Sequence, residues 1–362
     1  MVGVDLPDVT IRQRAMADVD DVACTGLTLL EEGAKAPEAA FAVQRVLLAA
    51  GRNPTVGFPF GNPVSFEWRH LPLLRVAYRV APKTNGVRVA LVLGVVPPPA
   101  GVASPSSAAG SAAAGAAPCA FLMDRTCRLF GLPLTAAPAW VFERGGTLLD
   151  AELVQDPARD GAWRLVVFDG ALVGGLSMQQ APLSVRLQMA AGVVDKLAAP
   201  GFAFGVKTMV PLVAGVTAEA VLGPEPRLPS DGFVLTPEYA GATTAGTAET
   251  VFKLKDPHTL DIWWADTGLW YGDGADFVSL AMLRPEVVVQ GLPDTPPVKP
   301  VVVELAITAV SDRTLTLQFV AHRPGKHAPN NARCVMRTLV SAQEGVTLAD
   351  IVSRCADPSY SE

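Results

Sequence analysis

The sequence predicts an α+β protein in which a larger mixed domain is followed by a small β-barrel. Helix-like and strand-like segments alternate as far as residue 256, whereas short apolar strands follow one another from Asp261 onward, as they do in small barrels. The chain has 362 residues, half of them hydrophobic, which is enough for two ordinary domains. We therefore expect a mixed domain over 1–256, a β-domain over 257–340, and a C-terminal helix over 341–362 that packs back on the first domain.

Three segments have the apolar spacing of helices. Apolar residues recur three to four positions apart in residues 22–50, which end before Gly51, in residues 184–197 and in the closing segment 345–356.

Runs of β-branched and aromatic residues predict the strands. The first two runs, within residues 75–96, are separated by Lys83-Thr84-Asn85-Gly86, and residues 57–66 ahead of them read as a turn-rich loop. Residues 97–118 are rich in Ala, Gly, Ser and Pro and predict a disordered loop insertion. The further predicted strands are 120–132, 140–143, 147–154, 163–175, 231–237 and 250–255, then 261–264, 267–272, 301–310 and 314–321 in the β-domain.

Composition and charge exclude several classes of protein. We find no apolar stretch typical of a membrane span and no apolar N-terminal segment typical of a secretory signal. The net charge of −6 argues against a protein that coats long nucleic acids, so any nucleic-acid contact should be confined to a chain end. Five cysteines without a CxxC pair indicate free thiols in a reducing compartment, and no zinc-binding pattern occurs.

The turn at Lys83 is the first candidate for chemistry. A lysine at the end of a strand, followed by a glycine turn, can project into a cleft. A lysine amine becomes a nucleophile once it loses its proton, and burial or nearby cations favour that state. An ordinary hairpin with a solvated lysine has the same pattern, so the turn indicates a catalytic lysine only in combination with other motifs.

Acidic and aromatic residues on two later strands are candidate ligand contacts. Asp150 and Glu152 lie two positions apart in an apolar strand and therefore share one face. Buried carboxylates need partners, so a ribose hydroxyl and Mg²⁺ are candidates, unless this face is solvated. Phe168 on the next strand could stack on a purine, although such a phenylalanine also fits a core.

The last third of the chain adds an aspartate and four cations. Asp231 enters a strand, whereas Lys253 and Lys255 alternate with apolar residues and share one face. Two neighbouring ammonium groups repel unless an anion such as a triphosphate lies there. Arg323 and Lys326 lie in a loop of the β-domain and could cover a pyrophosphate. Plain turns and a solvated sheet face are the structural alternatives.

The order of these motifs resembles the covalent nucleotidyltransferase superfamily, which includes RNA capping enzymes and ATP- or NAD-dependent polynucleotide ligases. The details resemble the capping branch. Residues 57–66 (GFPFGNPVSF) are similar to its FPGxQPVS segment, and 231–237 (DGFVLTP) to its DGLIFTP rather than to the ligase EGxVxK. Residues 252–264 (FKLKDPHTLDIWW) are similar to KxKP…TxDF, and 323–331 (RPGKHAPNN) to RxDKxxPN. The resemblance covers 45–356.

The resemblance implies a nucleotidyltransferase domain with ATP-grasp-like antiparallel sheets and helices, followed by an OB-fold barrel that closes over the site. It implies that GTP guanylylates Lys83, and that GMP then moves from this lysine to the 5′-diphosphate end of RNA. It also implies Mg²⁺ or Mn²⁺ near Asp231 and Glu152. The nucleotide contacts that it implies are Arg88 and Glu152 at the ribose, Phe168 on guanine, Lys207 at the base or phosphate, Lys253 and Lys255 at the α-phosphate, Arg323 and Lys326 at the β,γ-phosphates, and Thr84 in the same pocket.

Three positions depart from the family pattern. Asn85 replaces the aspartate of KxDG, Ala151 the glycine of DGE, and Gly325 the aspartate of RxDK. The cations and Glu152 are all kept, so we expect an active enzyme. An ATP-dependent polynucleotide ligase and a non-catalytic nucleotide-binding capping subunit on the same fold are the alternatives.

The same resemblance sets the expected partners. No HCxxxxxR phosphatase motif occurs, so we expect a separate RNA triphosphatase and a separate cap methyltransferase. The Ala-, Val- and Pro-rich composition is typical of a GC-rich genome, and we expect the protein in the nucleus, or in a viral factory or virion.

Overall fold

The computed structural model describes residues 27–29, 36–96, 117–160, 162–224, 227–324, 326 and 328–355. Its chain forms two compact units. The larger unit draws on Thr25–Val64, His70–Leu254 and Leu348–Glu362, and the smaller unit on Ser65–Arg69 and Lys255–Thr347. None of the helices in the described part of the chain is long and apolar enough to cross a membrane.

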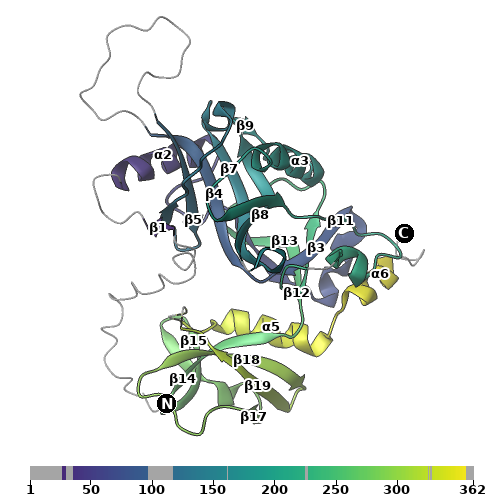
Figure 1. Cartoon of the computed structure of the whole chain (residues 1–362). Helices are drawn as coiled ribbons and strands as arrows, with labels where there is room; N and C mark the ends of the chain where they lie inside the picture. Colours follow the sequence, from purple (N-terminus) through teal and green to yellow (C-terminus); the bar gives the residue numbers. More distant parts are fainter. Residues whose placement is uncertain are drawn as a thin grey trace, which may run out of the picture. The chain divides into compact units, whose positions relative to one another are not determined.

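The larger unit contains two sheets, so the α+β class predicted from the sequence is confirmed (Figure 1). One sheet has the strand order β1-β6-β5-β4-β7-β8-β10, with β9 paired to β8, and the other has the order β11-β3-β12-β13-β2. The strands of the first sheet are β1 (Thr28–Leu29), β4 (Val87–Val96), β5 (Ala117–Asp124), β6 (Leu129–Gly131), β7 (Thr147–Asp156), β8 (Ala162–Val173), β9 (Leu176–Ser177) and β10 (Phe202–Val206). Those of the second are β2 (Gly61–Ser65), β3 (Tyr78–Thr84), β11 (Val210–Pro211), β12 (Ser230–Pro237) and β13 (Gly246–Lys255).

Helices cover the first sheet. Helix α2 (Ala36–Ala49) packs on β4, and α3 (Leu183–Val194) packs on β8 and β10. Val43, Val46 and Leu47 of α2 bury their side chains in one core with Val92 and Leu148 of the sheet. The remaining helices of this unit are α4 (Ala218–Leu222) and α6 (Leu348–Cys355), with 3-10 turns η3 (Ala139–Phe142) and η4 (Pro157–Arg159); a further 3-10 turn, η2 (Trp68–Arg75), begins in the smaller unit.

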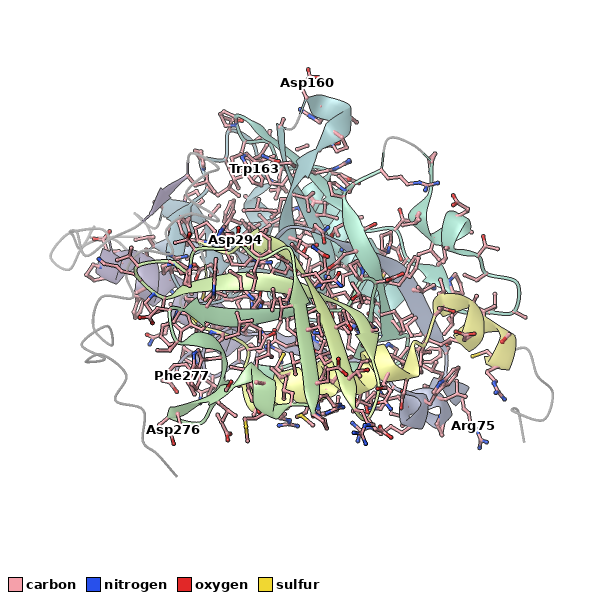
Figure 2. All side chains as sticks on the ribbon, turned by 90° about the horizontal axis from the view of Figure 1, so that it is seen from below. Arg75, Asp160, Trp163, Asp276, Phe277 and Asp294 are labelled. Atoms are coloured by element: carbon pink, nitrogen blue, oxygen red, sulfur yellow. The ribbon has the colours of Figure 1, made fainter. Side chains whose placement is uncertain are left out.

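The smaller unit is a six-stranded sheet with the order β16-β15-β14-β18-β19-β17. Its apolar core is closed by Val335 and Leu339 of helix α5. This arrangement is compatible with an OB-like barrel. Figure 2 labels Asp276 and Phe277 on the β15–β16 hairpin at one edge of the sheet, where the Phe277 ring packs on Trp263. The elements are β14 (Thr259–Ala265), β15 (Gly268–Asp273), β16 (Asp276–Ser279), η5 (Leu280–Met282), β17 (Glu286–Gln290), β18 (Val301–Val310), β19 (Thr314–His322) and α5 (Ala332–Glu344).

Several predicted elements need correction. The helix expected over 22–50 is wrong at its start, because β1 pairs with β6 there. Residues 140–142 lie in the 3-10 turn η3, which Glu143 ends, rather than in a strand. The turn-rich segment 57–66 contains strand β2, which tolerates Pro63 because it lies at a sheet edge. The loop predicted over 97–118 lies outside the described residues except for its last two, which begin β5.

Candidate active site

Lys83 lies at the end of β3, beside an irregularity in the neighbouring strand. Thr84 pairs with Ser230 and Pro82 with Phe233, so two residues of β12 bulge out opposite Lys83. One of these two is Asp231, whose Oδ1 lies 2.5 Å from Lys83 Nζ. Bulges of this kind re-aim side chains. Here the bulge gives the lysine a carboxylate partner.

The turn after Lys83 carries the chain from one sheet to the other. β3 belongs to the second sheet and β4 to the first, so the two strands are not the hairpin that their spacing also allows. Gly86 lies in this turn, close to β7. An added Cβ would lie 2.3 Å from the Leu153 carbonyl oxygen and 2.8 Å from Glu152 Cγ. The KxxG pattern therefore has a steric cause, because only glycine lets the lysine turn approach the acidic strand so closely.

Thr84, Glu152 and Lys207 form a hydrogen-bonded group next to Lys83. The Thr84 hydroxyl donates to Glu152 Oε2. Lys207 Nζ donates to Thr84 Oγ1 at 2.8 Å and to Glu152 Oε2 at 3.3 Å. Burial lowers the pKa of Lys207, and the charge of Lys83 adds to this effect, although Glu152 opposes it. Two lysines and a carboxylate therefore meet at the end of β3.

Arg88 on β4 is held by Asp150 on β7. Its Nε donates to Asp150 Oδ1 at 3.0 Å and its NH2 to Oδ2 at 2.6 Å, a two-pronged pair. The same guanidinium donates to the Gly61 carbonyl and to Asn62 Oδ1 in β2. Burial would lower the pKa of Arg88, but Asp150 and other carboxylates more than offset it, so the pKa is raised. Burial also raises the pKa of Asp150 to about 6, despite Arg88.

Phe168 on β8 faces this group of charges. Its neighbours Val167 and Asp169 are buried, whereas Phe168 is half-buried. Lys207 Nζ lies 5.2 Å and Arg88 Cζ 5.5 Å from the centre of the ring, within the range of cation–π attraction. The ring is therefore part of the polar site rather than of the core, and it offers a surface on which a base can stack.

A buried ion pair supports β8 behind this ring. Asp169 and Arg186 of α3 form two hydrogen bonds, of 2.6 and 3.2 Å. Arg186 also donates to the carbonyls of Ala181 and Ala240. Because the guanidinium is fully buried, these partners are needed to satisfy it, and they fix α3 against the strand that carries Phe168.

The smaller unit carries a second charged cluster. Asp261 of β14 and Glu304 of β18 are paired in register. Arg323 NH1 lies 2.7 Å from Glu304 Oε2, and Lys255 Nζ lies 3.6 Å from Glu304 Oε1. Lys326 forms an ion pair with Asp261. Three of the sequence-predicted phosphate contacts thus lie together, each beside a carboxylate of its own unit.

The two units divide the sequence-predicted residues between them. The larger unit brings together Lys83, Thr84, Arg88, Glu152, Phe168, Lys207 and Asp231, and the smaller unit Lys255, Arg323 and Lys326. Lys253 is half-buried on β13, one residue before the boundary of the units. Sequence reasoning missed the Arg88 contacts of Asn62 and Phe58. The sequence did point to these two residues, because both lie in the GFPFGNPVSF segment.

No group of three or more His, Cys, Asp or Glu side chains in the described ranges is arranged to hold a metal ion. Asp231 and Glu152, the expected metal ligands, instead form ion pairs with Lys83 and Lys207. Mg²⁺ is usually held by one or two carboxylates together with substrate phosphates. The two side chains fit that mode and do not form a complete protein cage.

Comparisons with known proteins place the chain in a family. A family profile described as mRNA capping enzyme, catalytic domain, matches residues 21–257. A search of curated protein sequences found no match.

Two similar solved structures are DNA ligases. A mycobacterial DNA ligase D complexed with ATP is 14% identical, with a TM-score of 0.39 and with 74% of this chain and 94% of that chain covered. The ATP-dependent DNA ligase from bacteriophage T7 is 10% identical, with a TM-score of 0.38 and with 74% of this chain and 99% of that chain covered. Since the family match alone spans more than half of the sequence, the chain belongs to the mRNA capping enzyme family and contains its catalytic domain.

Proposed function

We propose that the chain is an mRNA guanylyltransferase that moves GMP from GTP, through a lysyl-GMP intermediate on Lys83, to the 5′-diphosphate end of RNA. The observation that carries this proposal is the position of Lys83. Its amine lies beside Asp231 at the end of β3, and it is close enough to Lys207 for its charge to lower the pKa of that lysine. A nucleophile, a carboxylate and a second cation are what transfer of a nucleotidyl group to an amine needs.

In the first step the Lys83 amine attacks the α-phosphorus of GTP. A P–N bond forms, the bond from the α-phosphorus to the bridging oxygen breaks, and pyrophosphate leaves with the electron pair. The amine must first lose a proton, and Asp231 Oδ1, at 2.5 Å, is the group in contact to accept it. Lys207 offsets negative charge that develops on the α-phosphate, which is how fixed cations accelerate phosphoryl transfer.

In the second step a terminal oxygen of the RNA diphosphate attacks the same phosphorus. The P–N bond breaks, Lys83 regains its proton, and the guanosine is joined to RNA through a triphosphate bridge. The phosphorus thus returns to an oxygen partner, and Lys83 ends as it began. Phe168 supplies the surface for guanine, and Arg88, fixed by Asp150, contacts the ribose.

The cations of the smaller unit complete the proposal. Arg323 and Lys326 bind the β,γ-phosphates and Lys255 binds the α-phosphate, and each exchanges its carboxylate, Glu304 or Asp261, for phosphate oxygens. A divalent cation held by Asp231, Glu152 and the phosphates would neutralise charge on the leaving pyrophosphate.

Label transfer tests the proposal. The protein is incubated with α-labelled GTP or ATP and Mg²⁺, resolved on a denaturing gel and digested for mass spectrometry. We expect GMP on Lys83, in a bond stable to alkali and labile to acid, and little label from ATP. Lys83→Arg should abolish the adduct, because arginine stays protonated, whereas Lys196→Arg, at an exposed lysine, should keep it. An adduct on another residue, or one that persists in Lys83→Arg, would refute the assignment. Preferential labelling by ATP would indicate a ligase.

A further inference from the structure

Arg125 lies next to the candidate active site at the end of a neighbouring strand. The last pair of the β4–β5 ladder is Val89–Asp124. One residue further along the two strands are Arg88 and Arg125. On its other side Arg88 pairs with Glu152 of β7. The three residues therefore form a row across the strands, with Arg88 in the middle and Arg125 on the side away from Glu152 and Lys207.

The turn that carries Arg125 is fixed by Asp124. Asp124 Oδ1 accepts hydrogen bonds from the backbone amides of Thr126 and Arg128, both at 2.9 Å. Its Oδ2 accepts a hydrogen bond from Arg128 Nε at 2.6 Å. Cys127 completes the turn with a left-handed φ of 64°. The buried carboxylate thus uses both oxygens on its own turn, and of the two arginines there it pairs with Arg128.

Arg125 differs from the other cations of the larger unit's site. Lys83, Arg88 and Lys207 each form an ion pair with a carboxylate. Within the described ranges no carboxylate forms an ion pair with Arg125, and the residue is exposed at the surface although nearby protein atoms partly desolvate its guanidinium. Partial burial and then the charge of Arg88 lower its pKa, yet an arginine keeps its proton in proteins. A fixed positive charge beside another one is unfavourable unless an anion joins it.

We propose that Arg125 binds the 5′-terminal phosphates of the acceptor RNA. This inference rests on the proposed function, because it names where the second substrate binds. GTP and the RNA end both offer phosphates. The position of Arg125 favours the RNA, because Lys207 pairs with Glu152 on the opposite side of Arg88, and the nucleophile Lys83 is close enough to Lys207 for its charge to act there. Arg125 is exposed at the strand end, where a chain end can reach it.

The binding test uses short fluorescent RNAs that differ only at the 5′ end. Anisotropy titrations of the full chain compare a 5′-diphosphate RNA with the same RNA ending in a 5′-hydroxyl. We expect the wild type to prefer the diphosphate RNA, and Arg125→Gln to lose about tenfold of that preference, the usual effect of one hydrogen-bonded ion contact. Arg125→Lys should keep part of it. Arg45→Gln, at an exposed arginine of α2, is the matched control and should bind both RNAs as the wild type does.

The outcomes separate this inference from its alternatives. An unchanged preference in Arg125→Gln, or no preference in the wild type, would overturn it. An equal loss for both RNAs would also overturn it, because Arg125 would then contact the RNA backbone. The assay needs no guanylyl transfer, so a wild type that forms no GMP adduct but shows the expected anisotropy would refute the proposed function alone.

A second measurement separates the RNA from GTP. Adduct formation with GTP is compared with transfer of GMP from the isolated adduct to the diphosphate RNA. In Arg125→Gln the transfer rate at low RNA concentration should fall at least about fivefold more than adduct formation. If adduct formation falls more than transfer, Arg125 binds the GTP phosphates and the inference is wrong.

Discussion

Gly86 is the residue at which the fold and the proposed chemistry are most directly linked. Gly86→Ala adds one methyl group to the turn after Lys83. Its carbon would lie 2.3 Å from the Leu153 carbonyl oxygen and 2.6 Å from Val154 Cγ1. Both atoms belong to β7, at the centre of the sheet, so they cannot move aside easily. The lysine turn must therefore shift away from β7 by roughly 1 Å to reach ordinary contact distance.

A shift of that size has two different costs. Overpacking of this kind reduces the free energy of unfolding by about 1–3 kcal/mol, which leaves an ordinary domain folded. A reacting group displaced by about 1 Å loses on the order of a hundredfold in rate. We therefore expect Gly86→Ala to remain folded, to bind GTP nearly as well as the wild type, and to form the lysyl-GMP adduct about a hundredfold more slowly.

Single-turnover adduct formation and urea denaturation measure the two costs separately. Gly192→Ala is the matched control, because Gly192 lies in α3 and an added Cβ would meet nothing within 4 Å. It should raise the free energy of unfolding by up to about 1 kcal/mol, the helix preference for alanine, at an unchanged rate. An adduct rate in Gly86→Ala within threefold of the wild type would show that the close approach does not position Lys83.

Two further predictions concern carboxylates that pair with arginine. The pKa of Asp150 is raised from 3.8 to about 6 in the folded protein, so protonation of this carboxyl stabilises the fold. This contribution to the free energy of unfolding is complete below the unfolded pKa of 3.8 and is lost as the pH rises through 6. When the pH is lowered from 7 to 5, the free energy of unfolding of the wild type should rise by about 1 kcal/mol because of this group. Denaturation curves of Asp150→Asn should lack that rise, and an equal pH response in both proteins would contradict the prediction. Glu304→Gln removes the carboxylate beside Lys255 and Arg323 and should destabilise the smaller unit at neutral pH by about 2 kcal/mol, whereas Glu286→Gln, at an exposed glutamate, should not; equal unfolding curves of the two variants would show that the Glu304 pairs contribute nothing.

Local sequence patterns predicted most of the strands, because alternating apolar residues and runs of β-branched residues do form strands in the fold. They could not predict which strands pair. The runs on either side of Lys83 look like a hairpin, yet β3 and β4 belong to different sheets. The close approach of Gly86 to Leu153 and Val154, which leaves no room for a Cβ, shapes the turn, and it joins residues far apart in sequence.

Helix α5 was missed for a different reason. It buries Val335 and Leu339, four positions apart on one face, and exposes Met336 and Val340, so the apolar spacing of a helix is present but short. Its start is set by Asn331, whose side chain accepts a hydrogen bond from the Cys334 amide. That cap lies within the segment that resembles the RxDKxxPN motif, and the motif by itself does not indicate that a helix follows.

The candidate site was easier to predict by resemblance than by residue chemistry, because each motif alone also fits a structural role. What distinguishes the site in the fold is that its cations and carboxylates neutralise each other across strands. Asp231 pairs with Lys83, Asp150 with Arg88 and Glu152 with Lys207. The motif spacing predicts none of these pairs, since each joins residues more than fifty positions apart.

This network also bears on the departures from the family pattern. Ala151 is fully buried and pairs with Val89 and Val167, so its methyl group fills the core rather than the site. Asn85 is exposed in the turn, and its backbone amide donates to the Pro229 carbonyl, a bond that any residue but proline would make there. Both departures therefore spare the three carboxylates that neutralise the site. Each of the three lysine and arginine side chains is costly to bury alone, and each lies opposite a matching acid.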